Sequence, residues 1–186
     1  MIPNDRAFNG QNYFQDGDKT IYRYQRFDKA GAYRIKIRFV SVNSPYKQGF
    51  AIKFSKKPEF KGTFLINGVQ LSDPKKKHLN YIIQEGVYLD NEFEIELEMK
   101  DGFVAFCNAS NYLSQAMIDK VVKMTGKSAE QFENKGFTSG FSAANMYGNA
   151  FWIEQLSNNH YRFHCNDHEM DEDYDDLIFD MVITAL

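Results

Sequence analysis

Hydrophobic and polar residues alternate along most of this chain with a period of two. In segment 33–39 (YRIKIRF) apolar residues alternate with Arg and Lys, and in segment 93–99 (FEIELEM) they alternate with Glu. Successive side chains of a β-strand point to opposite faces, so each segment predicts a half-buried antiparallel strand with one apolar and one charged face. If the two strands were neighbours, the basic face of the first would complement the acidic face of the second.

Shorter segments of strand character follow at 50–54, 81–89, 151–156, 160–165 and 177–184. Between strands, the dipeptides Asn67-Gly68 and Asp101-Gly102 are typical of type I′ turns, whose two central residues both have positive φ. Each dipeptide therefore predicts a β-hairpin.

The period changes once along the chain. From Ser110 to about Lys123 the apolar positions recur at helical spacing, at Leu113, Met117, Val121 and Met124. Ser110 or Asn111 could cap the start of this helix, and Gly126 closes its end. An apolar stripe of this kind normally packs against a protein core.

A second short helix is predicted from Ser128, because Gln131 follows it at capping-box spacing. We therefore expect one or two helices around 110–135, within a helical and loop insertion over 110–149. The chain of 186 residues can bury one large core, and its 16% aromatic content favours sheets. The expected fold is a single, mainly β domain over 1–186, an antiparallel β-sandwich of the jelly-roll kind.

Charge and hydropathy narrow the range of partners. The net charge is −3 and no basic stripe is long enough to follow a phosphate backbone, so we expect no nucleic-acid partner. No apolar run is long enough to predict a membrane-spanning helix, so we expect no membrane partner. The first residues lack a basic segment followed by an apolar one, so no secretory signal is predicted. The chain is expected to be cytoplasmic or a piece of a larger extracellular protein.

Two cysteines, Cys107 and Cys165, each fall in a predicted strand. Two cysteines are too few for a disulfide framework, and they lack the spacing of a zinc site. They are expected either to be buried reduced thiols or to form a single bridge between strands.

The densest charge in the chain lies in segment 167–176 (DHEMDEDYDD). Its carboxylates include the alternating Asp171, Asp173 and Asp175, flanked by Asp167 and Asp176. Hard cations such as Ca²⁺ take six to eight oxygen ligands, and alternating carboxylates supply several of them from one short segment. The segment is not an EF-hand, because Asp176 stands where that loop requires glycine. A cation site, a solvated acidic turn and an acid–base site are the three interpretations.

A resemblance to known modules starts from segment 171–179 (DEDYDDLIF). It resembles the D-x-D-[YF]-[ND]-D-L-[VI] end motif of calcium-associated β-sandwich modules in bacterial extracellular proteins. The strand pattern, with AGAYRIKIRF at 30–39 and LINGVQL at 65–71, resembles that of galactose-binding-like jelly rolls. The resemblance implies a non-catalytic module, often sugar-binding and often stabilised by an ion.

The histidines suggest a rival metal site. His160 and His164 share one face of a predicted strand but would lie roughly 13 Å apart, too far to bind one ion. His164 could instead join His168 or Asp167 across a turn, as in metal-dependent enzymes of the cupin type, which hold such ligands inside a barrel. The chain contains no G-x-S-x-G, P-loop, G-x-G-x-x-G or H-E-x-x-H motif.

Sugar binding requires exposed aromatic rings that stack on pyranose faces, with amide groups nearby. The candidates are Trp152, Tyr147, Tyr112 and Asn149, and the alternative for each is burial in the core.

Three functions follow from these patterns. The leading one is a non-catalytic ligand-binding module for carbohydrate, with calcium held by segment 167–176. Its expected ligands are Asp171, Asp173 and Asp175, helped by Asp167 and Asp176. The second is a metal-dependent, cupin-like enzyme that uses His164 and His168. The third is a structural or assembly domain.

Overall fold

The computed structural model describes residues 12–46, 48–55, 61–66, 69–70, 81–84, 92–111, 115–127, 137–139, 149–167 and 173–186. These residues form a mainly β fold of antiparallel sheets, with one α-helix among the elements described. The expected mainly β, antiparallel sandwich is confirmed. Its jelly-roll connectivity stays a prediction.

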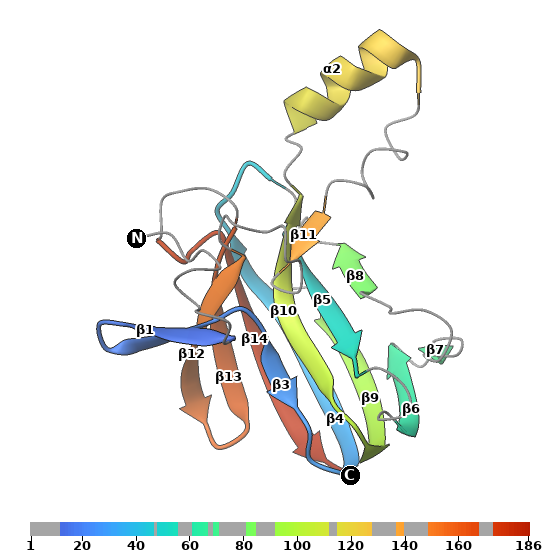
Figure 1. Ribbon diagram of the computed structural model, residues 1–186, viewed down its shortest axis with the longest axis vertical. Helices are drawn as coiled ribbons and strands as arrows, with labels where there is room; N and C mark the ends of the chain where they lie inside the picture. Colours follow the sequence, from blue (N-terminus) through green and yellow to red (C-terminus); the bar gives the residue numbers. More distant parts are fainter. Residues whose placement is uncertain are drawn as a thin grey trace.

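The larger sheet has nine strands. In spatial order they are β1 (Tyr13–Asp16), β2 (Lys19–Tyr22), β12 (Ala150–Ser157), β13 (His160–Asn166), β14 (Leu177–Ala185), β4 (Gly31–Val42), β9 (Glu92–Asp101), β6 (Lys61–Ile66) and β7 (Val69–Gln70). The smaller sheet has five strands: β11 (Phe137–Ser139), β10 (Val104–Asn111), β5 (Gln48–Phe54) and β8 (Tyr81–Gln84) in order, with β3 (Gln25–Phe27) also paired to β10. In Figure 1, β10, β5 and β3 lie in front of β4, β14 and β9.

The core lies between the two sheets and is rich in phenylalanine. Phe50 of the smaller sheet contacts Phe179 of the larger one edge to face, with ring centroids 5.4 Å apart. Phe163 stacks on Phe179 at 4.5 Å. These rings are 0–2% exposed, and burying such large apolar surfaces is the main force that holds the sheets together.

The charged faces of β4 and β9 meet as their sequences predict. Arg34 pairs across the strands with Glu96, and Lys36 with Glu94. Ion pairs join Arg34 to Glu96 at 2.8 Å and Lys36 to Glu92 at 3.0 Å. The pairs are solvated and each stabilises the fold by only about 0.2–1 kcal/mol, so their main effect is to favour this register.

The two predicted hairpins have different outcomes. Ile66 pairs with Val69, which confirms a hairpin around Asn67-Gly68, although the dipeptide itself lies outside the described residues. The hairpin at Asp101-Gly102 is wrong, because β9 pairs with β4 and β6, whereas β10 belongs to the other sheet. Gly102 has the expected positive φ, 86°. Both edges of β9 are already paired, so the turn instead carries the chain across to the second sheet.

The helix begins later than predicted. Helix α2 runs over Gln115–Thr125, and Ser110 and Asn111 are the last residues of β10 rather than helix caps. The helix ends as expected at Gly126, which has a φ of 66° and donates its N–H to the carbonyl oxygen of Val122.

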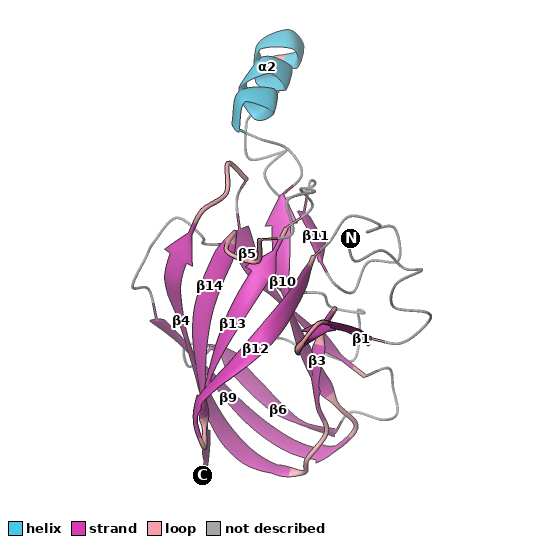
Figure 2. Ribbon diagram, turned by 90° about the vertical axis from the view of Figure 1, so that its left-hand side faces the viewer, coloured by secondary structure: helices cyan, strands magenta, loops and turns pink. Residues whose placement is uncertain are grey.

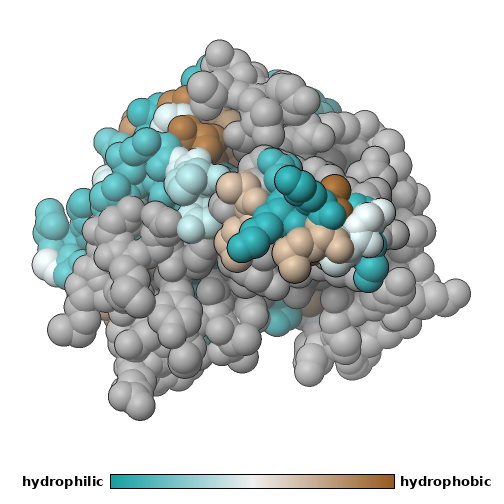
Figure 3. Space-filling view, turned by 90° about the horizontal axis from the view of Figure 1, so that it is seen from above, coloured by the Kyte–Doolittle hydropathy of each residue, from teal (hydrophilic) through white to brown (hydrophobic). Residues whose placement is uncertain are grey.

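The apolar stripe of α2 does not pack into the core as expected. Met117 and Met124 are 50% and 75% exposed, whereas Ile118 is buried. The helix extends beyond the strand ends, opposite the C-terminus (Figure 2). Seen from above, its surface carries hydrophilic and hydrophobic residues side by side (Figure 3). The second predicted helix, from Ser128, lies outside the described residues.

Cys107 and Cys165 are both buried free thiols, the first of the two expected states. Burial raises the pKa of the Cys165 thiol well above its usual range, and the nearby Cys107 and Asp176 act in the same direction. The Cys165 side chain is therefore kept as a neutral thiol.

Among the described residues, no helix is long and apolar enough to cross a membrane.

Candidate functional site

One end of the sandwich has polar residues where a core would normally be apolar. We call it the buried polar end, and its members are Gln48, Asn108, Ser110, Asn149, Asn166, Asp167 and Asp176. All seven are 0–3% exposed. They come from β5, β10 and the ends of β12, β13 and β14, at the end of the sandwich from which α2 projects (Figure 1).

Strand alternation explains why these polar groups are enclosed. Gln48 precedes Phe50 by two residues on β5, so both side chains point toward the other sheet. Asn108 follows the core residue Phe106 in the same way on β10. Asp167 continues the inward-facing series of Phe163 and Cys165. On each of these strands, the side chains that face the other sheet therefore change from apolar to polar over two residues.

The two buried carboxylates belong to one hydrogen-bonded network. Asp167 Oδ2 accepts hydrogen bonds from Ser44 Oγ at 2.6 Å and from Gln48 Nε2 at 2.9 Å. The backbone N–H of Asp167 donates to Asp176 Oδ2 at 2.8 Å. The network therefore links β5 of the smaller sheet to β13 and β14 of the larger one.

Three amide side chains complete this network but leave their oxygens unsatisfied. Asn108 Nδ2 donates to the backbone carbonyl of Asn166 at 2.7 Å, and Asn166 Nδ2 donates to that of Asp167 at 3.3 Å. Within the described structure, Gln48 Oε1, Asn108 Oδ1 and Asn166 Oδ1 are buried without a hydrogen-bond partner. A buried acceptor left unpaired costs about 1–3 kcal/mol, so three in one patch require an explanation.

The predicted calcium ligands divide into two groups. Asp167 and Asp176 are buried and joined by a hydrogen bond. Asp173 is exposed and accepts the backbone N–H of Asp175, whose own carboxylate accepts Asn43 Nδ2 at 3.1 and 3.2 Å. Asp171 lies outside the described residues.

The described carboxylates, histidines and cysteines nowhere form a group of three that could hold a metal. A cation at the buried polar end would therefore need amide or backbone oxygens as further ligands.

Tyr174 anchors the acidic segment between its exposed and buried aspartates. Its φ is 58°, a conformation that costs a non-glycine residue stability. The side chain is 6% exposed and belongs to a small apolar cluster with Ile21 and Ala150. Packing of the ring offsets the backbone strain and holds the start of β14 in place.

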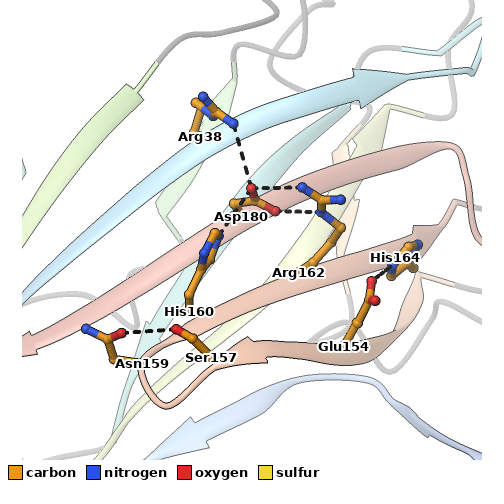
Figure 4. A network of polar contacts seen from close by, with 8 residues as sticks. All are labelled: Arg38, Glu154, Ser157, Asn159, His160, Arg162, His164 and Asp180. Carbon is orange, nitrogen blue, oxygen red and sulfur yellow. Dashed lines mark hydrogen bonds and ion pairs between the residues drawn. The ribbon is translucent and has the colours of Figure 1, made fainter.

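A second candidate region lies on the outer face of the nine-stranded sheet. We call it the outer-face pocket; its volume is about 260 Å³ and it is lined by Lys36, Arg38, Glu92, His160, Asp180 and Val182. Figure 4 shows Asp180 at the centre of a charged network beside it. Arg162 binds both carboxylate oxygens of Asp180, at 2.8 and 3.1 Å. His160 Nε2 lies 3.3 Å and Arg38 Nη2 3.8 Å from Asp180 Oδ2.

The electrostatics of this network favour charged forms. Burial alone would raise the pKa of Asp180, but the hydrogen bonds and positive charges of Arg162 and His160 outweigh it, and the pKa is lowered. The hydrogen bond to Asp180 raises the pKa of Arg162. Asp180 is therefore an anion that orients cationic side chains, and not a proton donor or acceptor at neutral pH.

The predicted sugar-binding residues do not form one site in the described structure. Trp152 stacks on His164 at 3.9 Å and an interplanar angle of 3°, and Lys19 Nζ lies over the indole at 4.4 Å. A ring cannot hold both groups on one face, so both indole faces are covered. Asn149 is buried and accepts a hydrogen bond from Ser110 Oγ at 2.9 Å. Tyr112 and Tyr147 lie outside the described residues.

The described residues give no support to a metal site that combines His164 with Asp167. His164 Nε2 lies 3.2 Å from Glu154 Oε2, and the ring packs on Trp152 at the outer face of the sheet. A cupin-type ligand would point into a barrel. His168 lies outside the described residues.

The sequence analysis missed three residues of the buried polar end: Gln48, Asn108 and Asn166. A signal for the first two was present, because a polar side chain occupies an inward position beside an apolar run in QGFAIKF and in VAFCNASN. Asn166 has no such signal, because it falls on the face opposite to Cys165 and its burial depends on the packing over that face.

Comparisons with known proteins find no significant match. No family model matches the chain, no curated protein matches its sequence and no solved structure matches its fold. The resemblance to galactose-binding-like and calcium-associated modules therefore stays a prediction.

Proposed function

We propose that this chain is a non-catalytic ligand-binding module, that its ligand is a small carbohydrate, and that a cation stabilises segment 167–176. The observation that carries the proposal is the outer-face pocket, whose lining combines hydrogen-bond donors and acceptors with the apolar side chain of Val182. Binding, rather than catalysis, is the simpler use of a pocket whose central carboxylate is fixed as an anion by Arg162.

The chemistry of the pocket suits sugar hydroxyls. A hydroxyl group both donates and accepts, and the lining offers the donors Lys36 and Arg38 beside the acceptor Glu92. Val182 supplies an apolar contact for a ring face. The volume of about 260 Å³ lies just below the roughly 300–1,000 Å³ range of drug-sized ligand sites, so the ligand is small.

Arg38 is the donor best placed to bind a ligand. Its guanidinium makes one ion-pair contact among the described residues, to Asp180 at 3.8 Å, too long for a hydrogen bond. Lys36, in contrast, already binds Glu92 at 3.0 Å. A ligand hydroxyl could therefore bind Arg38 without displacing a strong interaction.

The test is a titration of the protein with a panel of neutral and acidic mono- and disaccharides, followed by calorimetry or NMR. We expect Arg38→Ala to weaken binding about tenfold or more, since a hydrogen bond to a charged group contributes about 1.5–3 kcal/mol. Arg34→Ala is the matched control, because Arg34 lies on the same face of β4 outside the pocket. A panel without binding, or equal affinities in both variants, would overturn the proposal.

The cation part of the proposal has a separate support, the density of carboxylates in segment 167–176 and the burial of Asp167 and Asp176 at its ends. Neither the cupin-like enzyme nor the assembly domain has a supporting observation among the described residues.

A further inference from the structure

We infer that the buried polar end is a binding site for a hard divalent cation of the Ca²⁺ class, located between the two sheets. Its ligands are the carboxylates of Asp167 and Asp176 and the amide oxygens of Gln48 and Asn108. The inference deepens the cation part of the proposed function, on which it rests, and is independent of the carbohydrate part. It keeps Asp167 and Asp176 from the predicted ligand set and puts amide oxygens of the smaller sheet in place of Asp171, Asp173 and Asp175.

The first step is that the amide oxygens are free for a ligand. Each of the three amides uses its NH₂ group to reach an acceptor on the Asn166–Asp167 dipeptide: Gln48 the carboxylate of Asp167, Asn108 the carbonyl of Asn166, and Asn166 the carbonyl of Asp167. Turning any amide around would bring two acceptor oxygens together, so the orientation is forced. The oxygen of each amide is left beside the same dipeptide without a hydrogen-bond partner in the described structure.

The second step is that a cation satisfies this set of atoms at once. Amide and carboxylate oxygens accept hydrogen bonds or coordinate metals, but they cannot bind one another. The four side chains offer at least four oxygens, and backbone carbonyls or water would complete the six to eight that Ca²⁺ takes. The set contains no sulfur or imidazole ligand, which distinguishes it from a zinc site.

The third step is charge. Two carboxylates bring a formal charge of −2 into a region where all four proposed ligand side chains are 0–3% exposed. A divalent cation balances that charge, and its removal from water is offset by direct coordination. Mg²⁺ needs strict octahedral geometry at short distances and keeps several waters, so a mixed cage of side chains from both sheets suits Ca²⁺ better.

The fourth step is the position of the ligands in the fold. Gln48 and Asn108 belong to the smaller sheet, and Asp167 and Asp176 lie at the ends of strands of the larger one. A cation held by both sets would join the two sheets above the phenylalanine core. Since the site exists only in the folded chain, binding stabilises the folded state directly.

The experiment uses the full chain after treatment with EDTA and measures the melting temperature and heat of binding as CaCl₂ is added. We expect Ca²⁺ at a hundred times its dissociation constant to raise the melting temperature by roughly 5–10 °C. We expect Gln48→Met and Asn108→Leu to abolish most of this shift while still folding in EDTA, because each removes an unpaired buried oxygen. Gln155→Met, the same change at an exposed position of β12, should keep the full shift.

Two further variants keep the test decisive. Asp176→Asn keeps an acceptor for the Asp167 N–H but removes one negative charge, and we expect it to weaken Ca²⁺ binding at least tenfold, a readout that remains even if the leucine variant does not fold. Asp173→Asn with Asp175→Asn removes two carboxylates of the acidic segment that lie outside the proposed site, and we expect it to retain most of the shift.

The outcomes separate the inference from the proposed function. If the shift survives Gln48→Met and Asn108→Leu but is lost with the exposed aspartates, the inter-sheet site is wrong and a cation bound by the acidic segment stands. If the wild type shows no shift with Ca²⁺, both the inter-sheet site and the cation part of the proposed function are overturned. The carbohydrate titration remains a separate test in either case.

Discussion

The outer face of the nine-stranded sheet and the buried polar end both gather polar side chains, but they satisfy them differently. On the outer face, Arg34 and Lys36 meet glutamates of the next strand at 2.8–3.0 Å, and the buried Arg34 Nε, which makes no hydrogen bond, still lies 3.2 Å from the carboxylate of Glu94. At the buried polar end, amide oxygens are 0–1% exposed and lack partners in the described structure. The difference shows which polar cluster needs a ligand: paired surface charges favour a register, whereas unpaired buried acceptors require something that is not part of the chain.

The largest effect is expected from Asp167→Ala at the buried polar end. The change leaves Ser44 Oγ and Gln48 Nε2 without their acceptor in a closed region. We expect a loss of about 3 kcal/mol in the free energy of unfolding, from the buried donor of Gln48 and the half-buried donor of Ser44 at about 1–3 kcal/mol each. Urea denaturation in EDTA measures it, and a loss no larger than that of an exposed Asp→Ala change would contradict the contrast between the two regions.

A substitution of Asp180 tests whether this residue of the outer face contributes as much to the free energy of unfolding as residues of the buried polar end do. Asp180→Ala removes the anion that Arg38, Arg162 and the imidazole of His160 face, although Arg162 remains partly solvated. We expect a loss of about 2 kcal/mol, below the roughly 3–5 kcal/mol of a fully buried broken pair. A loss below 0.5 kcal/mol in the same urea assay would show that the network is screened like an ordinary surface pair.

The lowered pKa of Asp180 predicts an acid-sensitive part of stability. Because the pKa is lower in the folded than in the unfolded chain, the contribution is present above the ordinary value of 3.8 and is lost as the pH falls through the folded value. We expect the free energy of unfolding of the wild type to fall more steeply below about pH 4 than that of Asp180→Asn. Parallel curves for the two proteins between pH 2 and 5 would refute this assignment.

The smallest effect is expected from the ion pairs between β4 and β9. Glu96→Ala removes a partner of Arg34, but both side chains are more than one-third exposed. We expect a loss of about 0.2–1 kcal/mol that shrinks further in 1 M NaCl, because solvent and salt screen the pair. A double-mutant cycle with Arg34→Ala measures the coupling. A coupling energy above 2 kcal/mol would mean that the outer-face ion pairs stabilise the fold as strongly as the buried polar end.

Much of the sheet architecture could be predicted, because the information is local. The alternation in 33–39 and 93–99 identified both strands and their charged faces, and the complementarity of those faces predicted their pairing. The turn after β12 likewise led to the β12–β13 hairpin. The prediction from local sequence was wrong at Asp101-Gly102. The turn itself was predicted correctly, but the strand after it does not pair with the strand before it. A turn reverses the direction of the chain, and it does not determine which strand the chain pairs with next.

The candidate site was predicted in part only. The density of aspartates in 167–176 drew attention to the correct end of the molecule, but it gave the greatest weight to exposed residues. Gln48 and Asn108 precede Asp167 by 119 and 59 positions in the sequence. No local pattern relates residues so far apart.

The sequence by itself determined which residues alternate, where glycines permit a turn or end the helix, and which charges can pair across neighbouring strands. These properties follow from the period of a strand and from backbone sterics, which act over a few residues. Only the tertiary structure decided which aspartates are removed from water and which amides surround them. Burial depends on the packing of two sheets against each other, and the same Asp or Asn is a solvated turn residue or an enclosed ligand according to what the other sheet places above it.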